Sequence, residues 1–482
     1  MNKLKLFLEN FLVYGLGGII SKIIPLIMVP IVTRLMPNST YFGISDMSNT
    51  IISFASAVAI IGMYDAMYRI FFEKDSIEYQ RCVCSTTLIF TLVTSVIVFL
   101  LLLLFKNPIA KLFLGSKEYT NLMYITAMAT LVTATNSIIS APTRMQNKRK
   151  IFLIINTITP ILSYSISIPL LLKGHYLIAL PLASVITGIT TEVIFWILNR
   201  KWFSLKEFDF TILKQLLVIA IPLFPNFLIY WIFNSSDKLM ITNMLGIDQA
   251  GIYSVGSKLG HISQLIYTAF AGGWQYFAFS TMKEKNQVKS NSLIFEYLGV
   301  ISYIATLFMC VFSFIIFNIL FTDDYINAYI VAPYLFLAPL LQMLFQVACN
   351  QFLVIKKTWP NLLILSIGAI ANIFINLILI PILGIEGAAI ATLIGYIISD
   401  IIAVIVLKKM KLMIVTKRMI ISAIIAIIYI ILWRIILKNS MILSVVSLVI
   451  CLICYFRLYK ADILSLFKNI KQAKKMWYTN YK

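Results

Sequence analysis

The chain has 482 residues, of which 60% are hydrophobic and 12% are charged, and its mean hydropathy is +0.92. Soluble domains average about 45–50% apolar and about 25% charged residues, so this composition excludes a soluble enzyme. The net charge of +21 does not indicate a nucleic-acid partner, because the positive residues follow a membrane-topology pattern. The sequence predicts an all-α integral membrane protein.

Hydropathy predicts fourteen transmembrane helices in chain order. About 20 residues at 1.5 Å per residue cross about 30 Å of hydrocarbon, and the apolar stretches match that length. The predicted spans lie at 11–33, 44–68, 84–105, 120–141, 151–172, 177–198, 216–242, 250–278, 293–319, 327–353, 360–381, 386–407, 417–437 and 440–456. The first span lacks a small-residue cleavage site, so we expect it to remain as a helix rather than to be removed as a signal peptide.

Positive residues predict the orientation of these spans. With the N-terminus inside, the inner segments hold 30 of the 40 Lys and Arg, the outer segments hold seven, and three lie within spans. The positive-inside rule therefore predicts that both termini are cytoplasmic. Inner loops of this kind face anionic lipid, which accounts for the basic charge.

The stretch from Asp248 to Ser280, which contains the eighth span, carries polar residues on one helical face. They recur at steps of three or four residues: Ser257, His261, Gln264, Thr268, Gly272 and Gln275. An offset of 208 residues leads back to the second span, where a stripe of the same phase contains Asp46, Asn49, Ser53 and Ser56. We interpret the two stripes as walls of one wet cavity.

An internal repeat extends beyond these two helices. Thr33–Met36 and Thr242–Leu245 occupy equivalent places, and Pro169–Gly174 is echoed by Pro381–Gly384. Each half then holds six spans, and an even number predicts parallel repeats about an axis along the membrane normal. The alternative is a gene duplication without transport.

The repeat predicts two pseudo-symmetric six-helix bundles around a central cavity, followed by a C-terminal helix pair. The predicted units are an N-terminal lobe at 1–205, a C-terminal lobe at 206–412, the additional pair at 413–457 and a basic cytoplasmic tail at 458–482.

Several segments resemble bacterial polysaccharide flippases, the Wzx-like exporters of O-antigen and capsule repeat units. That family belongs to the multidrug/oligosaccharidyl-lipid/polysaccharide exporter superfamily. The segments that carry the resemblance are Ile221–Asn226, Asn234–Lys238, Ala250–Ser254, Trp274–Gln275, Phe277–Phe279 and Ile380–Thr392. The resemblance covers essentially the whole chain. One departure is that few Arg lie in the spans, where many relatives line the cavity with cations.

The resemblance implies that the protein flips undecaprenyl-diphosphate-linked oligosaccharide from the inner to the outer leaflet of the bacterial cytoplasmic membrane. It also implies a V-shaped cavity and alternating access. The expected partners are the lipid-linked oligosaccharide and the bilayer, and a polysaccharide polymerase with its assembly proteins is a further candidate. No cofactor is expected, and a Na⁺ or H⁺ gradient is the candidate energy source.

The residues support such a substrate independently, because a diphosphate that leaves water needs cations. Lys22 and Lys258 are the buried candidates for that role. A charge near the bilayer centre costs about 2.5–3.5 kcal/mol on insertion scales, so each is a functional hypothesis by default. The alternatives are snorkelling for Lys22 and a structural ion pair for Lys258.

The other predicted cavity residues are polar or aromatic side chains: Asn49, Ser53, Asn226, Asp237, His261, Gln264 and Trp274. Asp237 is interpreted either as the anchor of Lys258 or as a ligand of a coupling ion. His261 is a proton or sugar ligand or else a packing residue between helices. Trp274 is a sugar-stacking surface or else part of an interfacial belt.

Two other functions stay open at this point. A multidrug or metabolite antiporter of the same superfamily would need acids deep in the cavity, whereas the deep charges here are lysines. A membrane polymerase or glycosyltransferase would need paired carboxylates on a large external loop. The loop at 106–119 has a single acid, Glu118. We therefore predict neither a catalytic set nor a metal site, since Cys451 and Cys454 form a CxxC in an apolar helix without acidic or histidine neighbours.

Overall fold

The computed structural model describes residues 22–480 except 283, 356 and 358. Every regular element in this part of the chain is helical. Eleven of its helices are long and apolar enough to cross a membrane, or twelve when the bent pair α2 and α3 counts as one span. The chain is a multi-pass, all-helical membrane protein, as the composition predicted.

Two of the fourteen expected spans are not among these twelve membrane-crossing helices. Residues 11–21 of the first span lie outside the described part of the chain, which is helical from 22 to 35. The eighth span is divided into α10 (Ile247–Gly260), the 3-10 turn η4 (His261–Ser263) and α11 (Gln264–Ser280). Neither α10 nor α11 alone is long enough to pass as a membrane-crossing helix.

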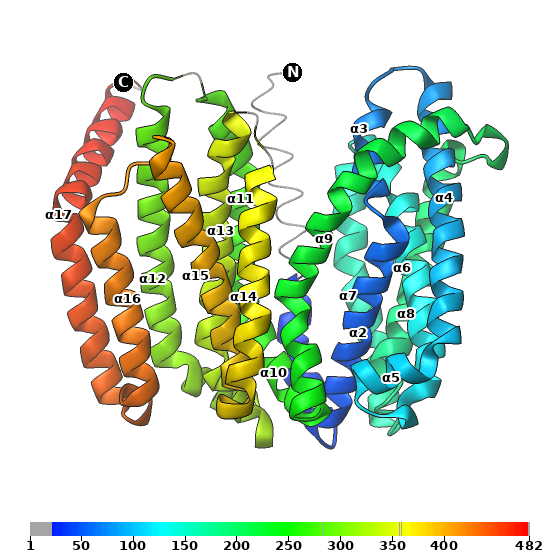
Figure 1. Cartoon of the computed structure of the whole chain (residues 1–482), viewed down its shortest axis with the longest axis horizontal. Coiled ribbons are helices and arrows are strands. Elements are labelled where there is room, and N and C mark those ends of the chain that lie inside the picture. The colour runs from blue at the N-terminus through cyan, green and yellow to red at the C-terminus, as the bar shows by residue number, and fades with distance from the viewer. Residues whose placement is uncertain (1–21, 283, 356, 358, 481–482) are drawn as a thin grey trace.

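The helices form two groups with α9 (Phe210–Met244) between them (Figure 1). One group contains α2 (Ser39–Ile60), α3 (Met63–Phe71), α4 (Ile77–Leu104), α5 (Lys106–Leu114), α6 (Leu122–Met145), α7 (Arg149–Leu172) and α8 (Ala179–Asn199). The other contains α10, α11, α12 (Gln287–Leu320), α13 (Ala332–Val354), α14 (Trp359–Leu383), α15 (Ile385–Lys409), α16 (Lys417–Ile435) and α17 (Met441–Asn480). The C-terminus lies at one end of the helices and α5 at the other, and these are called the C-terminal end and the α5 end below.

The second predicted span bends where α2 passes into α3. Ile61 and Gly62 both have left-handed backbone angles, and the two helices meet at 45°. Gly62 also lies against α9, because a Cβ added there would be 2.7 Å from the carbonyl oxygen of Ala220. Both the positive φ and this approach require glycine.

Helix α17 is longer than its predicted span. The structure continues it as one helix from Met441 to Asn480, through the residues expected to form a separate tail. The segment contains neither Gly nor Pro, so nothing in the sequence stops the hydrogen-bond ladder where the hydropathy falls.

The two helix groups meet at the α5 end, where α2 crosses α10 at a pair of glycines. A Cβ added to Gly43 would lie 2.2 Å from the Ile247 carbonyl oxygen, and one added to Gly251 would lie 2.1 Å from that of Ser39. Gly43 and Gly251 are separated by the same 208 residues as the two polar stripes. The crossing therefore brings equivalent positions of the two repeats together, and it depends on two residues without side chains.

We expect Gly251→Ala to loosen this crossing and to destabilise the protein by about 1–3 kcal/mol, because the added methyl meets backbone rather than a movable side chain. Thermal unfolding of the purified protein measures the change. Gly299→Ala is the matched control, since an added Cβ in that helix meets nothing closer than 3.6 Å. Equal midpoints for both variants would contradict the close approach of α2 and α10.

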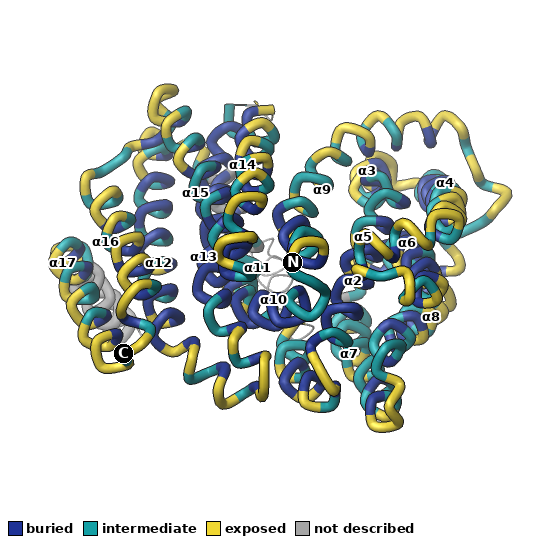
Figure 2. The backbone as a smooth tube through the Cα atoms, turned by 60° about the horizontal axis from the view of Figure 1, so that its bottom comes forward, coloured by how far each residue is buried: buried dark blue, intermediate teal, exposed yellow. Residues whose placement is uncertain are grey.

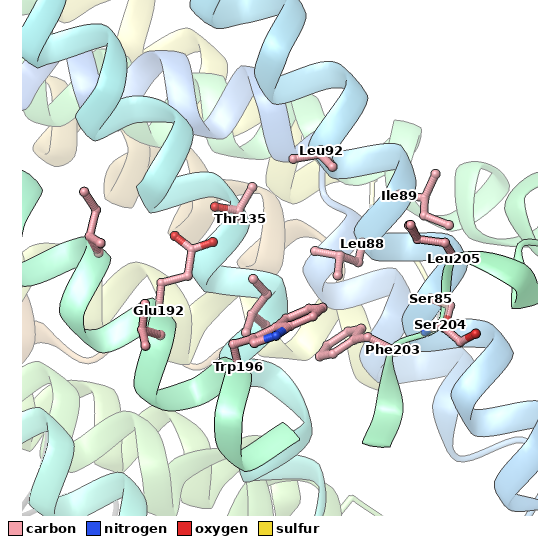
Figure 3. A pocket seen from close by; sticks show the side chains of 13 residues that line it. Ser85, Leu88, Ile89, Leu92, Thr135, Glu192, Trp196, Phe203, Ser204 and Leu205 are labelled. Carbon is pink, nitrogen blue, oxygen red and sulfur yellow. The ribbon is translucent and has the colours of Figure 1, made fainter. Parts of the chain in front are cut away.

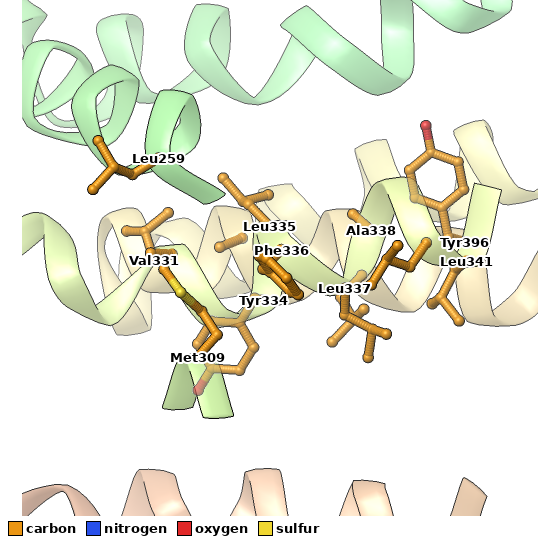
Figure 4. Packing of buried hydrophobic residues seen from close by; sticks show 14 of the residues in the cluster. Leu259, Met309, Val331, Tyr334, Leu335, Phe336, Leu337, Ala338, Leu341 and Tyr396 are labelled. Atoms are coloured by element: carbon orange, nitrogen blue, oxygen red, sulfur yellow. The ribbon is translucent and has the colours of Figure 1, made fainter. Parts of the chain in front are cut away.

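The largest hydrophobic core lies in the second group, around α13. In the most apolar stretch of α13, 89% is buried inside the protein, whereas the corresponding share is 6% in the helix at 150–172. Figure 4 shows Tyr334 of α13 beside Met309, and Tyr396 of α15 beside Ala338 and Leu341 of α13. Exposed residues lie mainly along the outer rims of both groups (Figure 2). Large apolar side chains are common among them, as expected for surfaces that face lipid.

Several polar side chains at helix starts and within spans are satisfied locally. The Asp209 carboxylate accepts hydrogen bonds from the backbone N–H groups of Ile212 and Thr211, which begins α9. These bonds hold the pKa of Asp209 below its usual value. Hydroxyls inside spans, such as Thr87 and Thr130, donate to a carbonyl one turn earlier, so they carry no unsatisfied donor into the membrane.

Candidate functional site: a buried ion cluster joining the two repeats

A buried carboxylate connects the two helix groups near the α5 end. Asp46 of α2 lies 2.7 Å from the Nζ atom of Lys238 on α9 and 2.9 Å from that of Lys258 on α10. Asp46 is 5% exposed, whereas the Lys258 side chain is 36% exposed. One acid of the first group is thus paired with two cations that approach from the other side of the crossing, and the cluster keeps a net charge of +1.

Two further contacts support this cluster. The Ser254 hydroxyl donates to the Asp46 carboxylate at 2.8 Å, and the Lys258 ammonium lies 4.8 Å from the centre of the Phe42 ring. Ser254 is the repeat equivalent of Asp46, 208 residues along the chain. Charge-assisted bonds from three donors compensate the carboxylate for leaving water.

Asp237 is not the anchor of Lys258, in contrast to one of the two interpretations drawn from the sequence. Its carboxylate accepts the backbone N–H of Lys238 at 2.8 Å and the hydroxyl of Tyr253. Asp237 and Lys238 are neighbours on α9, so their side chains point in different directions, and the Lys238 ammonium reaches Asp46 instead. Asp237 is therefore buried beside the ion cluster without belonging to it.

Asn49 and Ser53 lie on α2 beyond the cluster, toward the C-terminal end, and both are exposed. The Trp231 indole N–H of α9 donates to the Ser53 hydroxyl at 3.3 Å, and the Trp231 ring lies 4.7 Å from that of Phe54. Ser56, further along the same stripe, is buried. The α2 stripe therefore passes from the buried ion cluster to accessible polar side chains within two turns.

Lys22 is exposed, and its ammonium donates to the Thr268 hydroxyl of α11 at 3.2 Å. Thr268 belongs to the predicted stripe of the eighth span. Lys22 therefore contacts the polar stripe of the other repeat. Lys258 differs, because its ammonium is paired with Asp46.

The helix that carries the stripe of the eighth span is interrupted at η4. The His261 Nδ1 atom lies 2.7 Å from the Ser257 carbonyl oxygen and 3.0 Å from the Ser257 hydroxyl. A side chain that engages a backbone carbonyl competes with the helix ladder, which is a physical reason for the break that periodicity alone did not predict. Gln264 is half-buried and begins α11 directly after the break.

The remaining predicted site residues lie away from the ion cluster. Asn226 is half-buried on α9, eleven residues and thus about 16 Å of helix before Asp237. Trp274 is 3% exposed, and its ring is stacked 5.4 Å from that of Phe270. The structure does not describe the surroundings of four neighbouring residues of the stripe and the aromatic segment: Gly272, Gln275, Tyr276 and Phe277.

Sequence reasoning missed three features of this region. It placed Asp46 and Lys238 in their spans without pairing them, although their predicted depths were similar. It also missed the Arg34 guanidinium, which donates to the carbonyls of Ile319 and Leu320 at 3.2 and 3.1 Å and so caps the end of α12. At the C-terminal end, Arg144 donates to the Tyr64 hydroxyl at 2.8 Å.

The described side chains of this region form ion pairs and hydrogen bonds between the helix groups. Among the described residues, no group of three His, Cys, Asp or Glu side chains is placed to hold a metal ion. The cluster instead joins the repeats at one end and leaves hydrogen-bonding side chains accessible beyond it.

Comparison with known proteins extends this description. A family model described as "Polysaccharide biosynthesis protein" matches residues 31–330. An uncharacterized membrane protein of Methanocaldococcus jannaschii is 31% identical over 190 residues. That match covers 36% of this chain and only 35% of the relative, so the chain spans about a third of the length of that curated protein.

Solved structures show the fold. The lipid II flippase MurJ in an inward closed conformation matches with a TM-score of 0.72 at 15% identity, over 95% of this chain and 100% of that one. An inward-facing multidrug resistance MATE transporter of the MOP superfamily matches with a TM-score of 0.62 at 14% identity, over 82% and 98% of the two chains. A MATE transporter of Vibrio cholerae matches with a TM-score of 0.60 at 14% identity, over 85% and 98%.

Proposed function

Because the chain belongs to the polysaccharide biosynthesis protein family, we propose that it flips undecaprenyl-diphosphate-linked oligosaccharide across a bacterial cytoplasmic membrane. The family and the fold make the chain a membrane transporter of the MOP superfamily rather than an enzyme. The substrate is the proposed part. In this proposal the protein takes the product of glycosyl transfer from the inner leaflet and delivers it to the outer leaflet for surface polysaccharide assembly.

The observation that carries the proposal is the position of two lysines relative to the Asp46 cluster. Lys258 is tied to Asp46 at the α5 end, whereas Lys22 is exposed and its ammonium donates to a neutral hydroxyl. An ammonium that is accessible between the repeats is suited to a diphosphate, and the nearby amide and hydroxyl groups suit a glycan. A cationic drug would be repelled at the same place.

Alternating access follows if the Asp46 cluster opens and closes the α5 end. We infer two six-helix lobes with a central cavity between them and a transport cycle in which the α2–α10 crossing separates. We also infer fourteen spans, which are the twelve described above together with the first helix and the α10–η4–α11 unit. A Na⁺ or H⁺ gradient is the proposed energy source, because no nucleotide-binding loop appears in the sequence.

The test is complementation of surface glycan assembly in a flippase-deficient host, with protein abundance measured alongside. We expect the chain to restore the glycan. Resistance to cationic drugs without any restored glycan would support the multidrug antiporter instead and would overturn the proposal. The flippase-deficient host without this chain is the negative control.

The orientation has its own prediction, since inner loops hold most of the positive residues. A reporter fused after Lys148 is expected to read cytoplasmic, and one fused after Lys106 is expected to read external. The α5 end, which contains Lys106, would then be the outer side. Reversed readings would invert the direction of every step proposed here.

A further inference from the structure

Asp400 of α15 is a buried acid that the proposed cycle does not use. It is 8% exposed, and neither of its carboxyl oxygens has a hydrogen-bond partner among the described residues. It belongs to none of the ion pairs found there, in contrast to Asp46, Glu296 and Glu386, each of which has a cation within reach. Such a group in a protein interior requires an explanation.

The titratable groups described near Asp400 are phenols and a thiol, which are ordinarily uncharged at neutral pH. They are Tyr303 of α12, Cys349 of α13 and Tyr396, which lies one turn earlier on α15. The packed helices α13 and α14 contain no Asp, Glu, Lys or Arg at all.

The charged residues of the other neighbouring helices have partners or lie at a distance along the helix. They are Lys214, Asp237 and Lys238 on α9, Asp248 and Lys258 on α10, and Lys289 and Glu296 on α12. Both lysines near the α5 end are bound to Asp46, and Glu296 is paired with Arg418. Lys289 precedes Tyr303 by fourteen residues, which is about 21 Å of helix. On α15 itself, Lys408 and Lys409 follow Asp400 by about 12 Å of helix or more, and none of the described ion pairs includes Asp400.

The internal repeat shows that this acid is not an isolated feature of α15, because the same position is acidic in both halves. Glu192 of α8 and Asp400 of α15 are separated by 208 residues, the offset of the polar stripes and of the glycine pair. Each acid follows a buried hydroxyl residue, Thr191 or Ser399, and two basic residues come eight and nine positions after each acid. The sixth helix of each repeat thus contains an acid at the equivalent position.

The two acids differ in their access. Glu192 lines a cavity of about 500 Å³ between α4, α6 and α8, where its carboxyl group points toward Thr135 (Figure 3). Most of the other lining residues are apolar, among them Leu88, Leu92 and Trp196. Asp400 is buried and belongs to none of the described ion pairs, so an ionised carboxylate there would be poorly solvated and the neutral acid is favoured.

We propose that Asp400 is a proton-binding site of the second helix group, and that loss of this proton shifts the transporter toward another conformation. In the forward step the carboxyl O–H bond breaks, the proton passes to water and a carboxylate remains. That carboxylate requires hydration, which favours movement of α15 against α12 and α13. The conformational part rests on the proposed transport function, whereas proton binding does not.

Infrared spectroscopy of the purified full chain in lipid nanodiscs tests proton binding without any substrate. We expect a carbonyl band of a protonated carboxylic acid at neutral pH, and we expect Asp400→Asn to remove it. Asp400→Glu should retain a shifted band, which separates loss of the proton from loss of the fold. Glu192→Gln is the matched control and should leave the Asp400 band unchanged. Identical spectra of the parent and Asp400→Asn proteins would overturn the proposal.

Exchange of Na⁺ for K⁺ in the same experiment separates a proton site from a sodium site. Loss of the band in Na⁺ alone would show that the carboxylate holds that ion, and it would overturn proton binding under working conditions. We expect the band to be the same in both salts.

Spin labels test the conformational part. Labels at Glu78→Cys and Lys409→Cys, both exposed near the C-terminal end of the two groups, report the distance between α4 and α15. The background should have serine at the half-buried Cys82, Cys451 and Cys454. Raising the pH is expected to change the populations of the distance distribution about twofold or more when Asp400 is present. The change should be smaller in the Asp400→Asn variant, which has no titratable group at this position, and equal pH responses would overturn the coupling.

Discussion

Asp46→Asn is expected to reduce export more than about tenfold, because it removes the one negative charge shared by Lys238 and Lys258. Breaking a buried ion pair from one side typically costs about 3–5 kcal/mol, since the remaining charge is left uncompensated. Here two ammonium groups would be left without a partner. The loss falls on the contact between the helix groups, so we expect each group to keep its fold while closure at the α5 end fails.

Complementation measures export, and thermal unfolding of the purified protein reports stability. Asp75→Asn is the matched control, because Asp75 is an exposed acid in the loop between α3 and α4. A double variant, Asp46→Asn with Lys238→Met, removes one of the stranded cations and should recover part of the lost stability. Normal export by Asp46→Asn at normal abundance would show that the cluster does not take part in the cycle.

The fold was predictable from the sequence because hydropathy and repeat offset are local signals. Many spans begin and end within a few residues of their expected positions, as at Trp359–Leu383 against 360–381. The exceptions arise where hydropathy carries no information about backbone geometry. The bend at Gly62 depends on the backbone of α9, and the break at His261 depends on a bond to the Ser257 carbonyl.

The candidate site was only partly predictable. Periodicity found the polar stripes, and the structure places Asn49 and Ser53 where they are exposed and Thr268 where it is half-buried. Periodicity did not reveal which charges would meet, because Asp46 and its lysines come from helices about 200 residues apart. One signal was present in the sequence, namely the two glycines at the repeat offset. The close approach at Gly43 and Gly251 brings α2 and α10 near enough for Asp46 to reach across.

Lys22 should bind the diphosphate through its charge rather than its shape. Lysine binds phosphate as a compact point charge, so Lys22→Arg should retain much of the export. Lys22→Gln should lose most of it, and Lys22→Glu should lose all of it, since a carboxylate repels the diphosphate. Lys258 should follow the same order more weakly, because its ammonium is already paired with Asp46 in this conformation. Glycan complementation with matched abundance measures the series.

Thr268→Val separates the charge of Lys22 from its hydrogen bond. That bond, 3.2 Å long and exposed, is the contact by which Lys22 reaches α11. An exposed bond of this kind contributes little to stability, so the valine variant should fold normally and retain a cation at the same place. If export depends on charge, Thr268→Val should remain closer to the parent than Lys22→Gln does. The opposite order would assign Lys22 a structural contact between the repeats, and full activity of both Lys22→Gln and Lys22→Glu would remove it from substrate binding altogether.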